Sequence, residues 1–173
     1  MEKELIIPEK VTVEIDNKII KVSGPKGQLK KEFKYFFDIK ITKKENKVVV
    51  SAPSDKRKIK AMIGTIIAHI RNLINGVTEG YTYGMRIVYS HFPVTVKVED
   101  GKVMIHNFLG EKRPRIAKLV GDTKVEVKGQ DVILTGTSKD DIGKTCSNIE
   151  QACRISKYDR RIFQDGIYRI SGD

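Results

Sequence analysis

Arginines and aromatic rings alternate in the stretch SKYDRRIFQDGIYRI, residues 156–170. The side chains that carry this pattern are Tyr158, Arg160, Arg161, Phe163 and Tyr168. A guanidinium group forks onto phosphate oxygens and stacks on bases, and an aromatic ring stacks on an unpaired base. The other use of the rings is to pack on the domain and anchor the segment. The pattern therefore indicates a docked segment that presents arginines to a polyanion.

A second arginine-bearing segment is HNFLGEKRPR, residues 106–115, where Gly110 and Pro114 predict a loop. Most of the nine arginines follow residue 83: Arg86, Arg113, Arg115, Arg154, Arg160, Arg161 and Arg169. Residues 1–83 have the higher net charge, +7 against +4, but their cations are mostly lysines, which act as point charges on a solvated face. The type of cation therefore favours the second half as the nucleic-acid interface.

Other chemistry has little support in the sequence. The triplet Gly143–Thr145, GKT, is preceded by Gly136 with six residues between the glycines, and Gly143 falls inside a predicted helix, so it does not fit a phosphate-binding loop. The three histidines lie far apart, and no set of His, Cys, Asp and Glu has metal-ligand spacing. No nucleophile stands beside an activating base. We therefore expect no enzyme activity, no metal and no cofactor.

The whole chain of 173 residues has a formal net charge of +11. That charge points to nucleic acid as the first partner and an anionic membrane surface as the second. No apolar run approaches the roughly 20 residues of a spanning helix, and the start lacks a signal peptide, so we expect a cytosolic protein. Cys146 and Cys153 are about 10 Å apart along a predicted helix, too far to pair, and are expected to be buried thiols.

Two stretches of the chain repeat. VTVEIDNKIIKVSGPKG begins at Val11 and VTVKVEDGKVMIHNFLG at Val94, an offset of 83, and a later match between Val48 and Val132 has an offset of 84. A duplicated module explains both offsets, with one inserted residue. We therefore predict two modules, residues 1–82 and 83–173, with residues 76–93 as an ordered connection between them.

Each module is predicted to be a small antiparallel-rich sheet packed against one helix, which makes the fold α+β. An alternating strand leads to a turn, at residues 16–17 or 100–101, and a second strand follows. Further strands are predicted over residues 36–44, 47–52, 123–129 and 131–136. Ser54 and Ser138 are the predicted N-caps of the closing helices. The apolar stripes of these helices are Ile59, Met62, Ile63, Ile66, Ile67 and Ile70 in the first module, and Ile142, Cys146, Ile149 and Cys153 in the second.

Several of these motifs together resemble one known family. RRIFQDGIY, preceded by NIEQACRISK, closely resembles the C-terminal signature of the large-subunit ribosomal protein L6 family, in its archaeal and eukaryotic form. VYSHFPVTV and NFLGEKRPR resemble that family's interdomain join and second-module loop, and IPEKVTVEI and GPKG resemble its N-terminal module. The resemblance covers essentially the whole chain.

The resemblance implies a structural, non-enzymatic constituent of the large ribosomal subunit. It implies binding to large-subunit rRNA near the sarcin–ricin loop and the base of the factor-recruiting stalk, where the protein would support the translation-factor binding region. The implied partners are this rRNA and neighbouring ribosomal proteins, including stalk-base proteins. No membrane and no small-molecule substrate are implied. The implied rRNA-binding residues are Lys112, Arg113, Arg115, Lys157, Arg160, Arg161, Phe163, Asp165, Gly166 and Tyr168. One departure is Tyr158, where family members often have Lys, so the phosphate contact at 157–158 stays open. The alternative is a free-standing RNA-binding regulator or RNA chaperone.

We also predict how the arginine-rich segment is held. Asp165–Gly166 is expected to form a turn that folds the segment back on the second module, because glycine tolerates positive φ and Asp can bond the turn's own backbone. Phe163 and Tyr168 would anchor this turn on both sides. The adjacent arginines before it would then face RNA phosphates.

Overall fold

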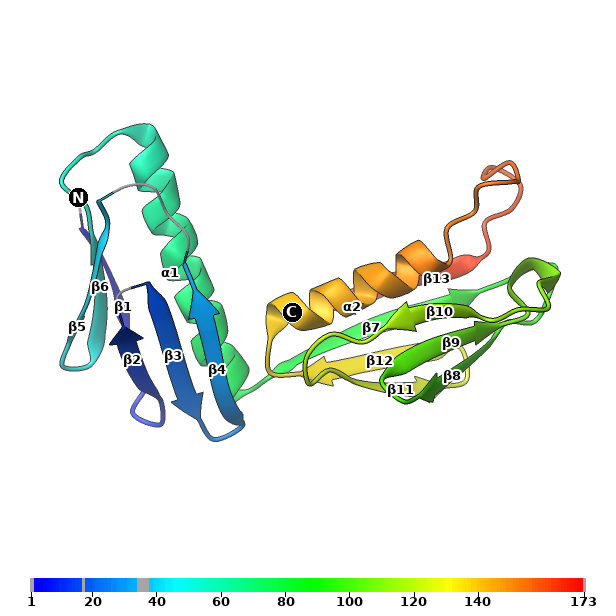
Figure 1. The fold of residues 1–173 in the computed structure, drawn as a ribbon, viewed down its shortest axis with the longest axis horizontal. Coiled ribbons are helices and arrows are strands. Elements are labelled where there is room, and N and C mark those ends of the chain that lie inside the picture. The colour runs from blue at the N-terminus through cyan, green and yellow to red at the C-terminus, as the bar shows by residue number, and fades with distance from the viewer. Residues whose placement is uncertain (1, 17, 34–37, 173) are drawn as a thin grey trace. The chain divides into compact units, whose positions relative to one another are not determined.

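The computed structural model describes residues 2–16, 18–33 and 38–172 (Figure 1). The chain divides into two compact units, Met1–Gly80 and Tyr81–Asp173. Each unit has its own cluster of buried apolar side chains. Each unit can therefore be treated as a separate folded body with its own core.

The first unit consists of two three-stranded antiparallel sheets and one helix. One sheet has the order β1 (Glu2–Ile6), β6 (Lys47–Ser51), β5 (Lys40–Lys44). The other has the order β2 (Thr12–Asp16), β3 (Ile19–Gly24), β4 (Gly27–Glu32). Helix α1 (Arg57–Thr78) packs on strands of both sheets.

The second unit repeats this plan and adds one strand. Its larger sheet has the order β11 (Lys124–Lys128), β12 (Asp131–Gly136), β7 (Tyr81–Val88), β13 (Gly166–Gly172). Its smaller sheet has the order β10 (Arg115–Lys118), β9 (Lys102–His106), β8 (Thr95–Glu99), with a short 3₁₀ helix (Phe108–Gly110) before β10. Helix α2 (Lys139–Ala152) packs on both sheets.

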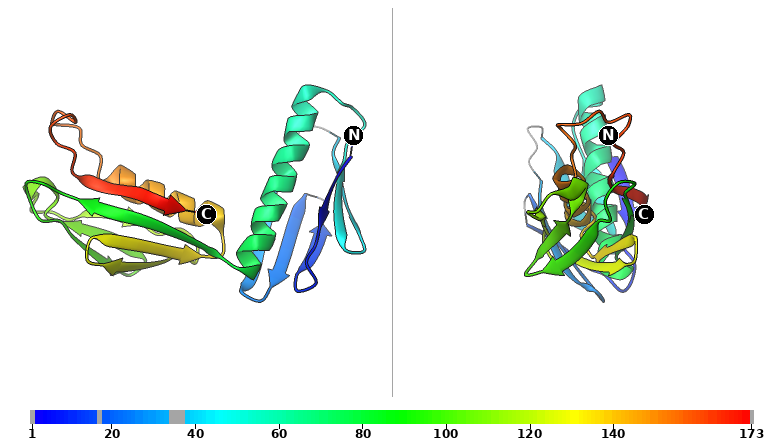
Figure 2. Two further views of the ribbon diagram at one scale, coloured as in Figure 1. Left: turned by 180° about the vertical axis from the view of Figure 1, so that it is seen from behind. Right: turned by 90° about the vertical axis from the view of Figure 1, so that its right-hand side faces the viewer.

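The strand orders of the two units correspond. The order β5-β6-β1 matches β11-β12-β7, and β2-β3-β4 matches β8-β9-β10, with a helix after the last strand pair in each case. This confirms the α+β fold built from a repeated sheet unit. The added strand β13 lies along the edge of β7, as Figure 2 shows. The residues predicted as a connection, 76–93, are instead the end of α1 and the strand β7, which opens the second unit.

The buried faces of the helices and of β7 follow from their apolar spacing. In β7 every second side chain is buried: Tyr81, Tyr83, Met85 and Ile87. Both predicted helical stripes face the cores; of their members only Met62 is half-buried. Cys146 and Cys153 are free and buried, as expected. Burial raises the pKa of the Cys146 thiol to about 11 and that of Cys153 to about 12, so both stay protonated and act as apolar packing groups.

Of the two serines predicted as helix N-caps, one caps its helix and the other does not. Ser138 caps α2, because its Oγ accepts a hydrogen bond of 3.3 Å from the Asp141 N–H. The prediction for Ser54 was wrong: α1 begins at Arg57, and its N-cap is Lys56, whose side chain makes no capping hydrogen bond. Ser54 Oγ accepts only from the Lys56 N–H, at 3.4 Å. The hydroxyl therefore closes a local turn two residues before the helix instead of capping it.

The predicted turn of the second copy is a left-handed hairpin turn. Asp100 and Gly101 both have positive φ, 46° and 71°, as a two-residue type I′ connection requires. Its counterpart in the first copy includes Asn17, which lies outside the described residues. Residues 36–37 of the strand predicted over 36–44 also lie outside them, and the described strand β5 begins at Lys40. In the part of the chain that the structure describes, no helix is long and apolar enough to span a bilayer.

Candidate nucleic-acid interface

Strand β13 docks the arginine-rich segment on the second unit. It pairs antiparallel with β7, with Gly166 opposite Val88 and Tyr168 opposite Arg86. The segment from residue 154 to 165 is thereby held at both ends, because it follows α2 and leads into β13. The expectation that this part of the chain folds back on the second module is confirmed.

The predicted turn, however, is in the wrong place. The chain turns at Asp159, whose carbonyl accepts from the N–H groups of Ile162 and Phe163 at 3.1 and 2.9 Å. Asp165 does not bond its own turn; its Oδ1 accepts from the N–H and the hydroxyl of Ser90, at 3.2 and 3.0 Å. Asp165 is 2% exposed. Its carboxylate ties the start of β13 to the residues that follow β7, a partnership that local sequence does not reveal.

Gly166 serves a different purpose from the one predicted. Its φ is not positive, so conformational freedom is not the reason for a glycine here. A Cβ at Gly166 would lie 2.9 Å from Cζ and 3.0 Å from the hydroxyl oxygen of Tyr168. The Tyr168 ring therefore occupies the space that a side chain at 166 would fill, and its hydroxyl donates to the Gln164 carbonyl at 3.0 Å.

Phe163 anchors the segment through a ladder of three rings. Its ring centroid lies 4.8 Å from that of His91 and 4.6 Å from that of Tyr158. Phe163 is half-buried and packs against the core of the second unit, whereas Tyr158 is 50% exposed. The ladder holds the segment beside the residues that follow β7.

Arg115 joins the loop 106–115 to the end of α2. Its Nε and Nη2 donate to the two carboxylate oxygens of Glu111, at 2.9 and 2.6 Å. Its Nη1 donates to the carbonyls of Ala152 and Arg154, at 3.0 and 2.9 Å. The guanidinium also lies over the Phe108 ring, 4.5 Å from its centroid. Arg115 therefore positions the loop, and its fork has no donor pair left for a phosphate.

The charges around this clamp link the two predicted segments. The hydrogen bond from Arg115 holds the pKa of Glu111 below its usual value, and the charge of Lys157 lowers it further. The same bond to Glu111 raises the pKa of Arg115. The bonds from Arg115 to the Ala152 and Arg154 carbonyls bring the loop and the start of the C-terminal segment to one end of the second unit.

The remaining predicted cations are exposed. Arg160 uses its Nε on the Ile155 carbonyl at 3.2 Å, and Arg161 pairs with the Asp159 carboxylate at 2.9 Å. That pair lowers the pKa of Asp159 and leaves the Arg161 side chain 90% exposed. Among the described residues, the side chains of Lys112, Arg113 and Lys157 have no hydrogen bond or ion pair. We call the set Lys112, Arg113, Lys157, Arg160 and Arg161 the cationic surface.

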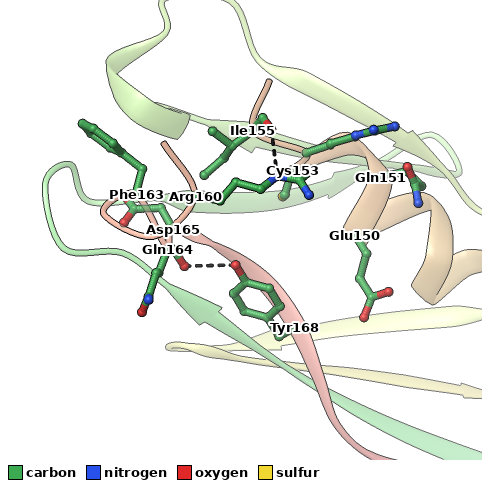
Figure 3. Close-up of a pocket in the computed structure, with 10 residues that line it drawn as sticks. Glu150, Gln151, Cys153, Ile155, Arg160, Phe163, Gln164, Asp165 and Tyr168 are labelled. Atoms are coloured by element: carbon green, nitrogen blue, oxygen red, sulfur yellow. Dashed lines mark hydrogen bonds between the residues drawn. The ribbon is translucent and has the colours of Figure 1, made fainter. Parts of the chain in front are cut away.

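A cleft of about 410 Å³ opens between the end of α2, the segment 154–165 and β13 (Figure 3). It brings together four predicted residues, Arg160, Phe163, Asp165 and Tyr168. It also includes Glu150 and Arg154, which sequence reasoning missed. The helical position of Glu150 could be predicted from the sequence, but the fold of the segment 154–165 over the helix end could not. No cluster of metal-binding side chains occurs among the residues described.

The sequence of this chain is similar to those of known proteins. The family model described as Ribosomal protein L6 matches residues 7–80 and 92–166, one segment in each unit. Large ribosomal subunit protein uL6 of Methanothrix thermoacetophila is 49% identical over 168 residues, which cover 97% of this chain and 95% of that protein. The uL6 proteins of Methanocella arvoryzae and Methanobrevibacter smithii are 50% and 51% identical, each over 98% of this chain and 96% and 94% of their own lengths.

Proposed function

Since this chain belongs to the ribosomal protein L6 family, we propose that it binds large-subunit rRNA through the cationic surface of its second unit. As a member of the family it is a protein of the large ribosomal subunit that serves translation on the cytoplasmic ribosome, and it is not an enzyme. The finer assignment concerns which side chains meet RNA and where on the subunit they do so.

The clamp made by Arg115 is the observation that carries the proposal. It joins two segments that are separated in the chain, so that Lys112 and Arg113 of the loop share one end of the unit with Lys157 of the segment. Phosphate contacts fix the position of a protein on RNA when the cations are held in a defined arrangement. The clamp supplies that arrangement.

The ten predicted residues divide into three groups. The five members of the cationic surface are proposed to contact phosphates. Arg115, Phe163 and Asp165 hold those contacts in place through the loop clamp, the ring ladder and the Ser90 bonds. Gly166 makes room for the ring of Tyr168, whose exposed part is available to RNA.

The resemblance to the family supports a proposed location as well. We place the contact near the sarcin–ricin loop and the base of the stalk, next to stalk-base proteins. Chemical footprinting of reconstituted large subunits tests this: protection of those rRNA elements on addition of the chain is expected, and protection confined to other elements would contradict the location.

Salt dependence tests the cationic surface. The full chain is titrated against large-subunit rRNA of Methanosarcina mazei, the source of a 49% identical relative, at several salt concentrations. Lys112→Ala with Arg113→Ala removes two phosphate contacts, so the slope of log affinity against log salt should fall by about 1.5. The matched control is Lys58→Ala with Lys60→Ala, which removes two charges from α1. Equal slopes in both double variants would contradict the proposal.

Co-sedimentation separates a subunit constituent from a free RNA-binding protein. The chain should sediment near-stoichiometrically with large subunits after a high-salt wash, because many contacts hold it in a fixed site. Complete release into the supernatant by that wash would favour a free-standing regulator.

A further inference from the structure

We propose that the cleft between the end of α2 and β13 binds one unstacked nucleotide of RNA, with its base on the ring of Tyr168 and its phosphate on Arg154 and Arg160. The inference rests on the proposed function, because it names a particular contact within the same RNA interface. It concerns a pocket for one base and its phosphate, and Arg160 belongs both to this pocket and to the cationic surface.

The ring of Tyr168 is held ready for stacking. One part of it covers the open space above Gly166, where a Cβ would approach Cζ to 2.9 Å. Its hydroxyl is fixed by the bond to the Gln164 carbonyl, at 3.0 Å, as Figure 3 shows. The ring borders the cleft and is 50% exposed. A ring that is already ordered loses little conformational freedom when a base stacks on it.

The charges in the cleft give a bound nucleotide one orientation. Of the Arg160 guanidinium, only Nε donates a hydrogen bond, to the Ile155 carbonyl. The Arg154 guanidinium makes no hydrogen bond or ion pair among the described residues. Glu150 also lines the cleft, and its Oε1 accepts from the Arg169 N–H at 3.3 Å. A phosphate is repelled by Glu150 and attracted by the two arginines. The base therefore faces Glu150, whose free oxygen accepts from an amino or imino group.

The size of the cleft matches a single nucleotide. Its volume of about 410 Å³ lies in the range of small-ligand sites, about 300–1,000 Å³. Its floor includes Cys153 and Ile155, which are buried and apolar. A paired helix cannot enter such a pocket, whereas a base that has left the stack can, and sequence-specific RNA recognition uses such bases.

Mononucleotide titration tests the cleft without the rest of the RNA. GMP, AMP, CMP and UMP are added separately to the full chain with ¹³C-labelled tyrosine, and the ring resonances are followed by NMR. The Tyr168 resonance, assigned from Tyr168→Phe, should move upfield and saturate, while that of Tyr89 stays in place. Equal, non-saturating shifts of both rings would overturn the proposal.

A glycine substitution displaces the ring without removing any contact group. In Gly166→Ala the three atoms nearest the new Cβ all belong to the far end of the Tyr168 ring, so we expect the ring to swing away and the strand to be kept. The affinity for Methanosarcina mazei large-subunit rRNA should fall about tenfold in Gly166→Ala and in Tyr168→Ala, with an unchanged salt slope, because stacking releases no counterions. Gly143→Ala, whose Cβ meets nothing within 4 Å, is the matched control.

The outcomes separate the two proposals. If the wild-type chain does not bind the rRNA, the proposed function fails, and the mononucleotide titration still decides the cleft. If the chain binds but Gly166→Ala and Tyr168→Ala match Gly143→Ala, the nucleotide pocket is wrong while rRNA binding stands. Melting temperatures of all variants show that the comparison is between folded proteins.

Discussion

At the scale of single residues, the largest difference between sequence and structure concerns Arg115. Its place in EKRPR predicts a phosphate contact, because arginine is the residue of choice for phosphate. In the structure the Arg115 guanidinium instead donates hydrogen bonds to Glu111 and to two carbonyls near the end of α2. Glu111 is only four residues from Arg115, but the two carbonyl partners lie 37 and 39 residues away, so the local sequence does not reveal the complete clamp.

Arg115→Lys should destabilise the second unit by about 1–2 kcal/mol, because lysine keeps the charge but cannot bond four acceptors in a fork. Urea unfolding measures the change. Arg113→Lys is the control and should leave the free energy of unfolding unaltered, since Arg113 is exposed and makes no bond among the described residues. Equal effects of the two substitutions would show that the clamp contributes nothing.

The Glu111 carboxylate should make the second unit sensitive to acid. Its pKa is lower in the folded than in the unfolded state, so its stabilisation is present above the unfolded value, about 4.3, and is lost as pH falls through the folded value. Between about pH 5 and pH 3, the free energy of unfolding should therefore fall less steeply with decreasing pH in Glu111→Gln than in the wild type. Glu99→Gln, which removes an exposed carboxylate, should keep the wild-type slope.

At the scale of secondary structure, the internal sequence repeat predicted more of the strands than the strand propensities of single residues did. The offsets of 83 and 84 residues place β2 on β8, β3 on β9, β5 on β11 and β6 on β12. The strands β1, β4, β7, β10 and β13 were not predicted, and two of them, β7 and β13, pair with each other. Their places depend on pairing between residues about 80 positions apart, as between Tyr168 and Arg86, which no local pattern records.

The two predicted serine caps offer a matched test at this scale. Ser138→Ala removes the bond to the Asp141 N–H and should cost about 1 kcal/mol of stability in the second unit. Ser54→Ala should cost far less, since Ser54 lies outside the first turn of α1. Thermal unfolding of both variants measures the difference, and a larger loss in Ser54→Ala would contradict the assigned helix start.

At the scale of the whole molecule, the two units have separate cores and different surfaces. The first is rich in lysine and the second in arginine. The arginine-bearing segments were identifiable from the sequence. The cleft, the clamp and the role of Gly166 were not, because each depends on how β13 closes the segment against α2.

The fragments 1–80 and 81–173 should each fold alone, because each contains a complete core. With excess tRNA as competitor, 81–173 should keep most of the affinity for large-subunit rRNA, whereas 1–80 should lose its binding. Far-ultraviolet circular dichroism establishes folding, and filter binding gives the affinities. Competitor-resistant binding by 1–80 and its absence from 81–173 would refute the assignment of the interface to the second unit.

The pairing of β13 with β7 also bears on how the protein is made. A chain emerging from a ribosome presents Tyr81–Val88 long before Gly166–Gly172 exists, so β7 waits with one edge unpaired during the synthesis of about 80 residues. Only when the last strand is added do residues 154–165 become a closed segment. A product that stops before Gly166 would thus lack the closed segment whose arginines are proposed to bind rRNA, so the pairing of β13 with β7 would have to precede rRNA binding.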